Sequence, residues 1–338
     1  LENLNPENPT DVTLYINLKS EVELYELMNK YKDDEWKLSI INSRISSYLT
    51  ERNTYLYGAE KSETQANEIT KKIEYITAKL DEDNWKYFAS QDLETANKKI
   101  EELNSQKQQT QDKEILKNLE NEIKNTKIEK EIAEYRLNKN IPYGTDYKNI
   151  TLSNLQSAST KLIQYNSQET ELSYEEQKEY NDSLKTEAEC RYILDTGINV
   201  NKSDSLKGIL QNFYSEFGIF LIVVIVMIAG TIVSDEFNKG TIKLLLVKPY
   251  TRNKILLSKF IATVIIIFFV ILSTVIMEML VGGVLFGFDS LSVPVIEYNF
   301  NTNMLEEINV FAYLGIQTLA QLPMIVLLAT LAFVISTL

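Results

Sequence analysis

The sequence contains no histidine and a single cysteine, Cys190. The lack of histidine removes the commonest general base and metal ligand, and with them any Ser-His-Asp or Cys-His nucleophile. One cysteine excludes an internal disulfide framework and a cysteine-rich zinc site. No GxxxxGK(S/T) run occurs, so the chain has no P-loop with which to bind ATP. We therefore expect a non-catalytic protein with no metal or cofactor site of its own.

Acidic charge is concentrated in the first part of the chain. The whole sequence has 34 basic and 47 acidic residues, and six basic and eight acidic residues lie from Glu216 onward. That leaves a net charge of −11 in residues 1–215. Binding of nucleic acid or anionic lipid needs clustered Lys and Arg, so we expect neither as a partner of this part. Such a charge is typical of a solvated surface.

Three long apolar runs occupy the last third of the chain: Phe217–Val233, about Ile255 to Phe288, and Val310 to the end. The first run is free of charge and covers roughly 26 Å as a helix, close to the thickness of a bilayer. The runs predict an all-α membrane protein with membrane helices at 213–233, 260–287 and 310–338. Because the chain starts without Met and stops inside an apolar run, we also expect a fragment with residues missing at both ends.

The charges of the connecting loops predict the orientation in the membrane. Residues 234–259 contain six basic and two acidic residues, whereas residues 288–309 contain four acidic residues and no basic one. Short loops rich in Lys and Arg stay in the cytoplasm. We therefore expect loop 234–259 inside the cell, and loop 288–309 and the domain 1–212 outside it. An outer domain in front of the first run implies a further span or signal anchor upstream.

The extracellular domain is expected to be helical. Asp11–Leu18 alternates apolar residues, which fits either a short strand or the entry to a helix. Over about 61–140 apolar residues recur at the spacing of heptad core positions, with a phase slip near Trp85 and a polar run at 105–113. This pattern predicts an antiparallel coiled-coil hairpin with its tip at the polar run, which serves either as a spacer or as an arm that contacts a ligand, the cell wall or a partner. Further helices are predicted at 21–31, 34–57, 151–168, 172–194 and 204–215.

The loop between the first two apolar runs, Glu236–Lys259, has its own pattern. Ile242 and Leu246 belong to the apolar face of a short amphipathic helix on the inner membrane surface, and Lys243 faces water or lipid phosphates. Pro249 ends this helix, because the residue before a proline avoids the helical region. A helix, a break and a second helix between two spans can transmit a push from a cytoplasmic partner.

The same run, E-F-x-x-G-T-I-x-x-L-L-x-x-P-x-x-R-x-x-x-L-x-x-K, resembles the first cytoplasmic loop of ABC-2-type transporter permeases. In particular it is similar to bacterial members with a large extracellular insertion between their first two spans, and the resemblance covers about Asp204–Leu338. It implies six spans in a bacterial cell membrane, a dimer of identical or different permeases, and a coupling helix that docks on a separate ATP-binding subunit. ATP is then held by that partner. The candidate coupling or loop-shaping residues are Glu236, Gly240, Thr241, Leu246, Pro249, Arg252 and Lys259.

Three polar residues stand inside the predicted spans. Glu278 lies about 27 Å along its helix from Phe260, near the outer boundary, so an interfacial position is favoured over a functional intramembrane charge. Gln317 and Gln321 either face a translocation route or pack the bundle, and packing is the simpler role.

The leading hypothesis from the sequence is the permease subunit of an ATP-driven exporter of unknown substrate. One alternative is a signalling or mechanotransmitting protein that uses the same ATPase coupling to move its outer hairpin. Another is a membrane-anchored adhesin or receptor without an ATPase. A hydrophilic route between the spans favours transport, whereas a dry, tightly packed bundle favours transmission.

Overall fold

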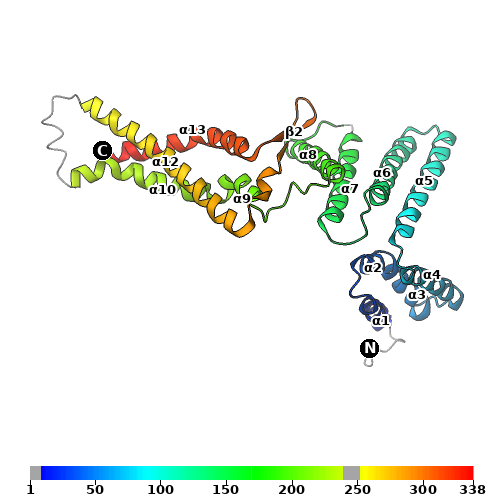
Figure 1. Ribbon diagram of the computed structural model, residues 1–338. Helices are drawn as coiled ribbons and strands as arrows, with labels where there is room; N and C mark the ends of the chain where they lie inside the picture. The colour runs from blue at the N-terminus through cyan, green and yellow to red at the C-terminus, as the bar shows by residue number, and fades with distance from the viewer. Residues whose placement is uncertain (1–8, 169, 239–251, 338) are drawn as a thin grey trace. The chain divides into compact units, whose positions relative to one another are not determined.

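The computed structural model describes residues 9–168, 170–238 and 252–337 (Figure 1). The chain divides into two compact units, Leu1–Gly197 and Ile198–Leu338, which we call the N-terminal unit and the membrane unit. The predicted extracellular domain extended to residue 212, whereas residues 198–212 belong to the membrane unit. Their short helix α9 packs against the membrane helices α12 and α13. Each unit is described by itself below.

The described part of the N-terminal unit consists of helices, with one π-helical segment, η1, between α2 and α3. The bounds are α1 Pro9–Lys30, α2 Glu35–Ile40, η1 Ile41–Ile45, α3 Ser46–Tyr57, α4 Glu63–Asp81, α5 Trp85–Gln109, α6 Lys113–Asn138, α7 Tyr147–Asn166 and α8 Tyr174–Thr196. Residues 11–18 lie inside α1, so the strand alternative for this segment is wrong and the helical one is right. The helices predicted at 34–57, 151–168 and 172–194 are confirmed in outline, the first being divided among α2, η1 and α3.

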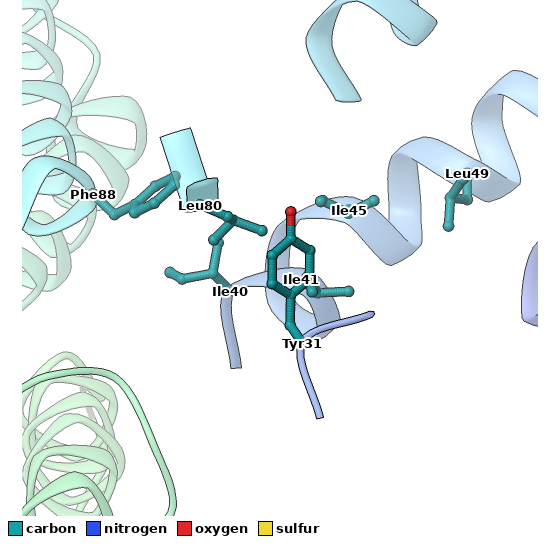
Figure 2. Close-up of a cluster of buried hydrophobic side chains, with 7 residues drawn as sticks. All are labelled: Tyr31, Ile40, Ile41, Ile45, Leu49, Leu80 and Phe88. Carbon is teal, nitrogen blue, oxygen red and sulfur yellow. The ribbon is translucent and has the colours of Figure 1, made fainter. Parts of the chain in front are cut away.

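One apolar cluster holds the first five helices together (Figure 2). Its buried members are Tyr31, Ile40, Ile41, Ile45, Leu49, Leu80 and Phe88. The π-helical turn brings Ile41 and Ile45 into this cluster, and both are fully buried. The ring of Tyr31 lies among these side chains, and its hydroxyl donates to Asp81 Oδ1 at 2.7 Å. Burial of each large apolar side chain stabilises the fold by roughly 1.5–3 kcal/mol, so this cluster fixes the arrangement of α1–α5.

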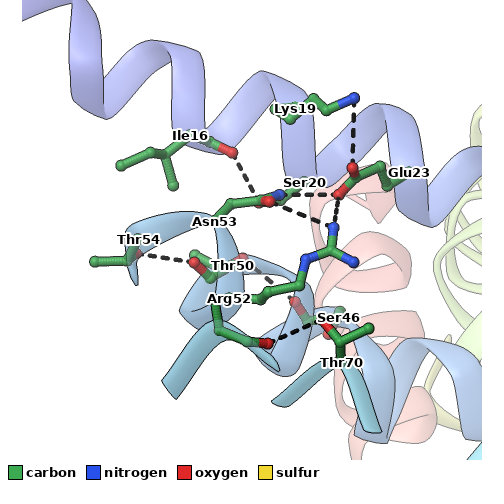
Figure 3. Close-up of polar contacts among 11 residues, drawn as sticks. Ile16, Lys19, Ser20, Glu23, Ser46, Thr50, Arg52, Asn53, Thr54 and Thr70 are labelled. Carbon is green, nitrogen blue, oxygen red and sulfur yellow. Dashed lines mark hydrogen bonds and ion pairs between the residues drawn. The ribbon is translucent and has the colours of Figure 1, made fainter. Parts of the chain in front are cut away.

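Polar contacts also join α1 to α3 (Figure 3). The buried Asn53 donates from Nδ2 to Ser20 Oγ at 2.9 Å and to Glu23 Oε2 at 2.9 Å. Arg52 pairs with the same Glu23 carboxylate, and Lys19 approaches it at 3.4 Å. A buried amide costs stability unless its donors find acceptors, so this network specifies how the two helices pair.

Helices α5 and α6 pack against each other and are joined by residues 110–112. The Asp112 side chain caps α6 by accepting from the backbone N–H of Glu114 at 2.9 Å. The ion pair Lys107–Glu120, at 2.7 Å, bridges the two helices near this turn. Their shared buried cluster is Leu103, Leu119 and Ile123. The turn lies inside the predicted tip at 105–113; heptad packing of the pair stays a prediction.

The first arm of the predicted hairpin needs correction, because α4 is a separate helix. Its apolar stripe packs into the cluster around Tyr31, where Leu80 is fully buried, and α4 contacts α3. Asp83 adopts a positive φ of 53°, and Lys37 Nζ lies 3.1 Å from its carboxylate. The chain therefore turns between α4 and α5, and the phase slip near Trp85 marks a helix boundary. The segment before Trp85 is not an arm of the hairpin.

A second polar centre lies where the Pro142–Gly144 break follows α6. Arg44 pairs with Asp92 at 2.7 Å, and the Tyr143 hydroxyl donates to the same carboxylate at 2.6 Å. The Arg136 guanidinium stacks over the Tyr143 ring at 4.2 Å from its centroid. Burial raises the pKa of Tyr143, so its hydroxyl stays a hydrogen-bond donor at neutral pH. The loop after α6 is thereby held against α5 and η1.

The membrane unit contains four helices and a small hairpin within its described residues. The bounds are α9 Leu206–Gln211, α10 Phe213–Asn238, α12 Arg252–Phe286, the 3-10 turn η2 Asp289–Ser292, β1 Val295–Asn299, β2 Met304–Ile308 and α13 Val310–Thr337. Strands β1 and β2 pair antiparallel, with Val295 opposite Ile308. The hairpin is a local exception to the all-α expectation. Gly287, with φ at 77°, ends α12 in a backbone conformation that glycine adopts without strain.

Three helices of this unit are long and apolar enough to cross a membrane: Phe213–Ile232, Lys254–Phe286 and Val310–Ser336. These ranges agree with the three predicted spans. Only 17% of the residues in the most apolar stretch of each helix are buried inside the structure. Large side chains such as Ile219, Val284 and Ile335 are more than two-thirds exposed, at 79%, 85% and 72%. Such a surface fits lipid or further helices rather than water.

Candidate functional site

The predicted coupling loop lies mostly outside the described residues. Gly240, Thr241, Leu246 and Pro249 all belong to residues 239–251, and so does the predicted amphipathic helix. Glu236 lies in the last turn of α10 and Arg252 is the first residue of α12. Lys259 lies in the second turn of α12, where its backbone carbonyl accepts from Thr263 Oγ1 at 2.9 Å. Their roles in coupling remain predictions.

The polar residues within the spans are described, and Glu278 is the most unusual of them. It lies on α12, two turns before the end of the helix at Phe286. Both of its carboxylate oxygens are buried, and neither has a hydrogen-bond partner among the described residues. A buried carboxylate without a partner is costly, so this side chain is a better functional candidate than its position along the sequence indicated.

A cavity of about 370 Å³ adjoins Glu278. A second carboxyl residue, Glu216, enters its lining from the start of α10. The rest of the lining is apolar except for Thr274 and consists of Ile209, Phe217, Thr274, Met277, Val281, Gly282 and Leu285. We call this the Glu278 pocket. Glu216 was not expected to take part in a site; its place directly before the first apolar run was the available signal.

The two predicted glutamines lie on α13. Gln317 donates from Nε2 to the backbone carbonyl of Gln211 at 3.2 Å, while its Oε1 is buried without a partner among the described residues. Next to it, the Tyr214 hydroxyl donates to Thr318 Oγ1 at 2.9 Å. Gln321 follows one turn later and is half-buried. Gln317 therefore joins α13 to the last residue of α9, and its packing role stays a prediction. The Tyr214–Thr318 pair was missed because neither residue is charged.

Beyond these contacts, a cluster of apolar side chains fills the centre of the interface between the described parts of the three membrane helices. Its buried members are Ile225, Ala229, Ile267, Ile271, Ile325 and Ala329. Further along, the backbone N–H of Ser234 on α10 donates to Ser336 Oγ on α13 at 3.1 Å. The polar groups thus gather toward the ends of the bundle, and the apolar packing lies between them.

No metal centre emerges from the part of the chain that the structure describes. Within those ranges no group of three or more acidic or cysteine side chains could hold an ion. The sole cysteine, Cys190, is buried among Ile141, Leu152, Leu155 and Leu194. Burial raises its pKa to about 12, which makes it a packing residue and not a nucleophile.

The family comparison matches mainly the membrane unit. A family described as "Protein of unknown function (DUF2705)" matches residues 168–338. Two curated relatives come from Bacillus subtilis (strain 168). The "Uncharacterized protein YhcI" is 33% identical over 125 residues, 37% of this chain and 39% of the relative. The "Uncharacterized membrane protein YdbK" is 37% identical over 90 residues, 27% of this chain and 36% of the relative.

This chain therefore spans less than two-fifths of the length of either relative. No solved structure matches it. The family match includes every helix of the membrane unit and reaches back to α8, whereas it leaves α1 to α7 unmatched.

Proposed function

This chain belongs to the DUF2705 family, whose function is unknown, and we propose that it is the permease subunit of an ATP-binding cassette exporter. A separate ATPase subunit drives it through the loop 236–259. The chain itself has no P-loop, in agreement with ATP being held by that partner.

The observation that carries this proposal is the sequence motif from Glu236 to Lys259, which lies between two apolar helices. Helices α10 and α12 contact each other and are both long enough to cross a bilayer. The loop therefore joins neighbouring spans, where a push on it is passed directly to both helices. Its six basic residues favour a cytoplasmic position, on the side where ATP is available. An adhesin or simple anchor has no need of such a sequence motif.

The exposed apolar surface of the spans supports assembly with further helices. Since only 17% of the most apolar stretch of each span is buried, most of this surface is free for lipid, for additional spans or for a second permease. We propose a homodimer or heterodimer in a bacterial cell membrane, with residues 1–212 outside the cell and two ATPase subunits beneath it. ATP binding then draws the coupling loops together and switches the spans between two arrangements.

One observation favours the second candidate function, transmission of ATPase work to the N-terminal unit without transport. The interface of the three described spans is apolar throughout its centre, from Ile225 to Ile271 and Ala329. A transport route in this protein must then lie on another face of the bundle. Both functions require the same ATPase coupling, so the first experiment tests that shared step.

The test is to co-express the chain with candidate P-loop ATPases encoded beside its gene and to purify the complex in lipid nanodiscs. We expect an ATPase to co-purify, and we expect Leu246→Glu to reduce its stimulation by the permease by at least ~10-fold, because a charge on the apolar face opposes docking. Lys243→Glu is the control, since it also adds an acidic residue but on the face predicted to meet water or lipid phosphates. Equal stimulation in wild-type chain and Leu246→Glu contradicts the assignment of this loop.

A further inference from the structure

The Glu278 pocket combines two features that rarely occur together: an apolar lining and two carboxyl residues from different helices. Glu216 comes from α10 and Glu278 from α12, and every other lining residue except Thr274 is apolar. The oxygens of Glu278 are shielded from solvent, so water does not solvate this charge. Two acidic groups in one apolar cavity repel each other and together favour a cation between them.

The described residues provide no such cation. The lining contains no Lys or Arg, and the hydroxyl of Thr274 already donates to the carbonyl of Val270 at 2.9 Å. The ammonium of Lys207, on the neighbouring α9, donates to the carbonyl of Val200 at 2.7 Å. The basic residues of the loop 234–259 lie far from Glu278, because the 19 residues of helix from Lys259 to Glu278 span about 28 Å. Among the described residues the pocket therefore has no counter-charge, and a cation from another molecule can supply one.

The rim of the pocket indicates what kind of molecule this is. Met277, Val281 and Leu285 line the cavity and are 60%, 54% and 69% exposed on the surface of α12. The cavity is thus open on an apolar side, from which a lipid-like molecule can enter directly from the bilayer. At about 370 Å³ it has room for a head group and the first part of a chain.

We infer that the Glu278 pocket binds the cationic head of an amphiphile, an amine with an apolar tail, between Glu216 and Glu278. The tail lies along Phe217, Val281 and Leu285 and continues into the lipid. This assignment rests on the proposed transport function, for which it names the substrate class. Glu278 contributes the buried charge partner, and Glu216, which is exposed, guides the amine into the pocket.

The experiment measures binding of dansyl-labelled dodecylamine to the full chain in nanodiscs of zwitterionic lipid, with dansyl-labelled dodecanol as the uncharged probe. We expect the amine to bind in preference to the alcohol. Glu278→Gln should weaken amine binding by about 30-fold, the loss typical of removing one partner of a buried charge pair. Glu306→Gln is the matched control, because Glu306 is an exposed carboxylate on β2 outside the pocket.

A second variant keeps the test independent of charge. Val281→Trp should fill the pocket and reduce amine binding while the carboxylates remain, and Glu306→Gln should bind as the wild-type chain does. Equal binding of amine and alcohol, or full amine binding by Glu278→Gln, would overturn the assignment.

Failure of this inference is distinguishable from failure of the proposed function, since binding needs no ATPase. Leu246→Glu should bind the amine normally while losing coupling. A chain that couples to an ATPase but does not bind the amine refutes the pocket assignment and leaves the permease proposal standing. Binding that depends on Glu278 supports the pocket assignment, and the absence of any ATPase partner then counts against the permease proposal alone.

Discussion

One buried polar side chain from each unit of this protein makes a useful comparison, because the two have different surroundings. In the N-terminal unit, Asn53 is fully buried, and its side-chain amide donates to both Ser20 and Glu23. In the membrane unit, both oxygens of Glu278 are buried without a partner among the described residues. The first arrangement specifies a fold, because each polar group fixes a neighbour. The second leaves an interaction open, which is typical of a binding site.

The apolar contacts of the two units also differ in what drives them. The cluster around Tyr31 removes apolar side chains from water, so the hydrophobic effect stabilises it. The cluster around Ile225 joins helices whose other faces remain exposed and apolar. If those faces contact lipid, the cluster exchanges lipid contacts for protein contacts and gains only better packing. Truncation of the same kind of buried side chain should therefore reduce stability by different amounts in the two units.

The largest expected effect is a loss of stability on truncating a buried isoleucine of the N-terminal unit. Ile41→Ala should lower the free energy of unfolding of this unit by about 2–5 kcal/mol, because Ile41 is fully buried and leaves a cavity. Ile225→Ala in the membrane unit should cost less, although Ile225 is also buried, at 1% exposure. Hydrogen exchange of the full chain in nanodiscs measures the first effect, and titration with SDS measures the second. Equal losses would show that the two cores are stabilised by the same force.

A smaller effect is expected from the buried polar groups. Asn53→Ala should cost about 1–3 kcal/mol, since it takes a donor from Glu23 and leaves Ser20 without one of its contacts. Thr50→Ala, on the same helix but exposed, should change stability by less than about 0.5 kcal/mol. Tyr214→Phe is the counterpart in the membrane unit, where the bond to Thr318 should contribute only about 0.6 kcal/mol. A loss from Tyr214→Phe as large as that from Asn53→Ala contradicts the contrast between the units.

The sequence predicts the membrane helices well and the N-terminal unit less well, for a physical reason. An apolar run such as Phe217–Val233 is long enough to specify a span by itself, because lipid requires every backbone group to be bonded within the helix. The apolar pattern that ends at Leu80 does not specify by itself what the helix packs against. It fits a hairpin arm and equally fits the cluster around Tyr31, and the turn at Asp83 decides between them.

The site is predictable only in part. Glu278 stands out as a charge within an apolar run, but its lack of partners depends on which residues the fold brings beside it. Glu216 directly precedes the charge-free run Phe217–Val233, so the sequence suggests only a boundary residue, whereas the fold of α10 and α12 brings it to the same cavity as Glu278. The β1–β2 hairpin was missed because short strands in a 22-residue loop leave little periodicity to detect.

The smallest expected effect is the slow reaction of the Cys190 thiol with a maleimide. This low background makes a labelling test of the membrane topology possible. The burial that raises the pKa of this thiol to about 12 leaves a thiolate fraction on the order of 10⁻⁴ at pH 8. The folded chain should therefore react slowly with a maleimide, and the unfolded chain in urea rapidly. Because the folded state holds this proton more tightly, the thiol's contribution to stability is complete below pH ~8.5 and is lost as the pH rises toward about 12.

Because Cys190 is expected to react only slowly in the folded chain, a single engineered cysteine can be labelled without removing the native one. A membrane-impermeant maleimide added to intact cells should modify Gln108→Cys, at the end of α5, but not Asn238→Cys, at the end of α10. After lysis both should react, while the signal of Cys190 stays at background. Labelling of position 238 from outside would place the basic loop on the outer face. A cytoplasmic ATPase then could not reach the loop. The proposed topology would be inverted, with the N-terminal unit inside the cell.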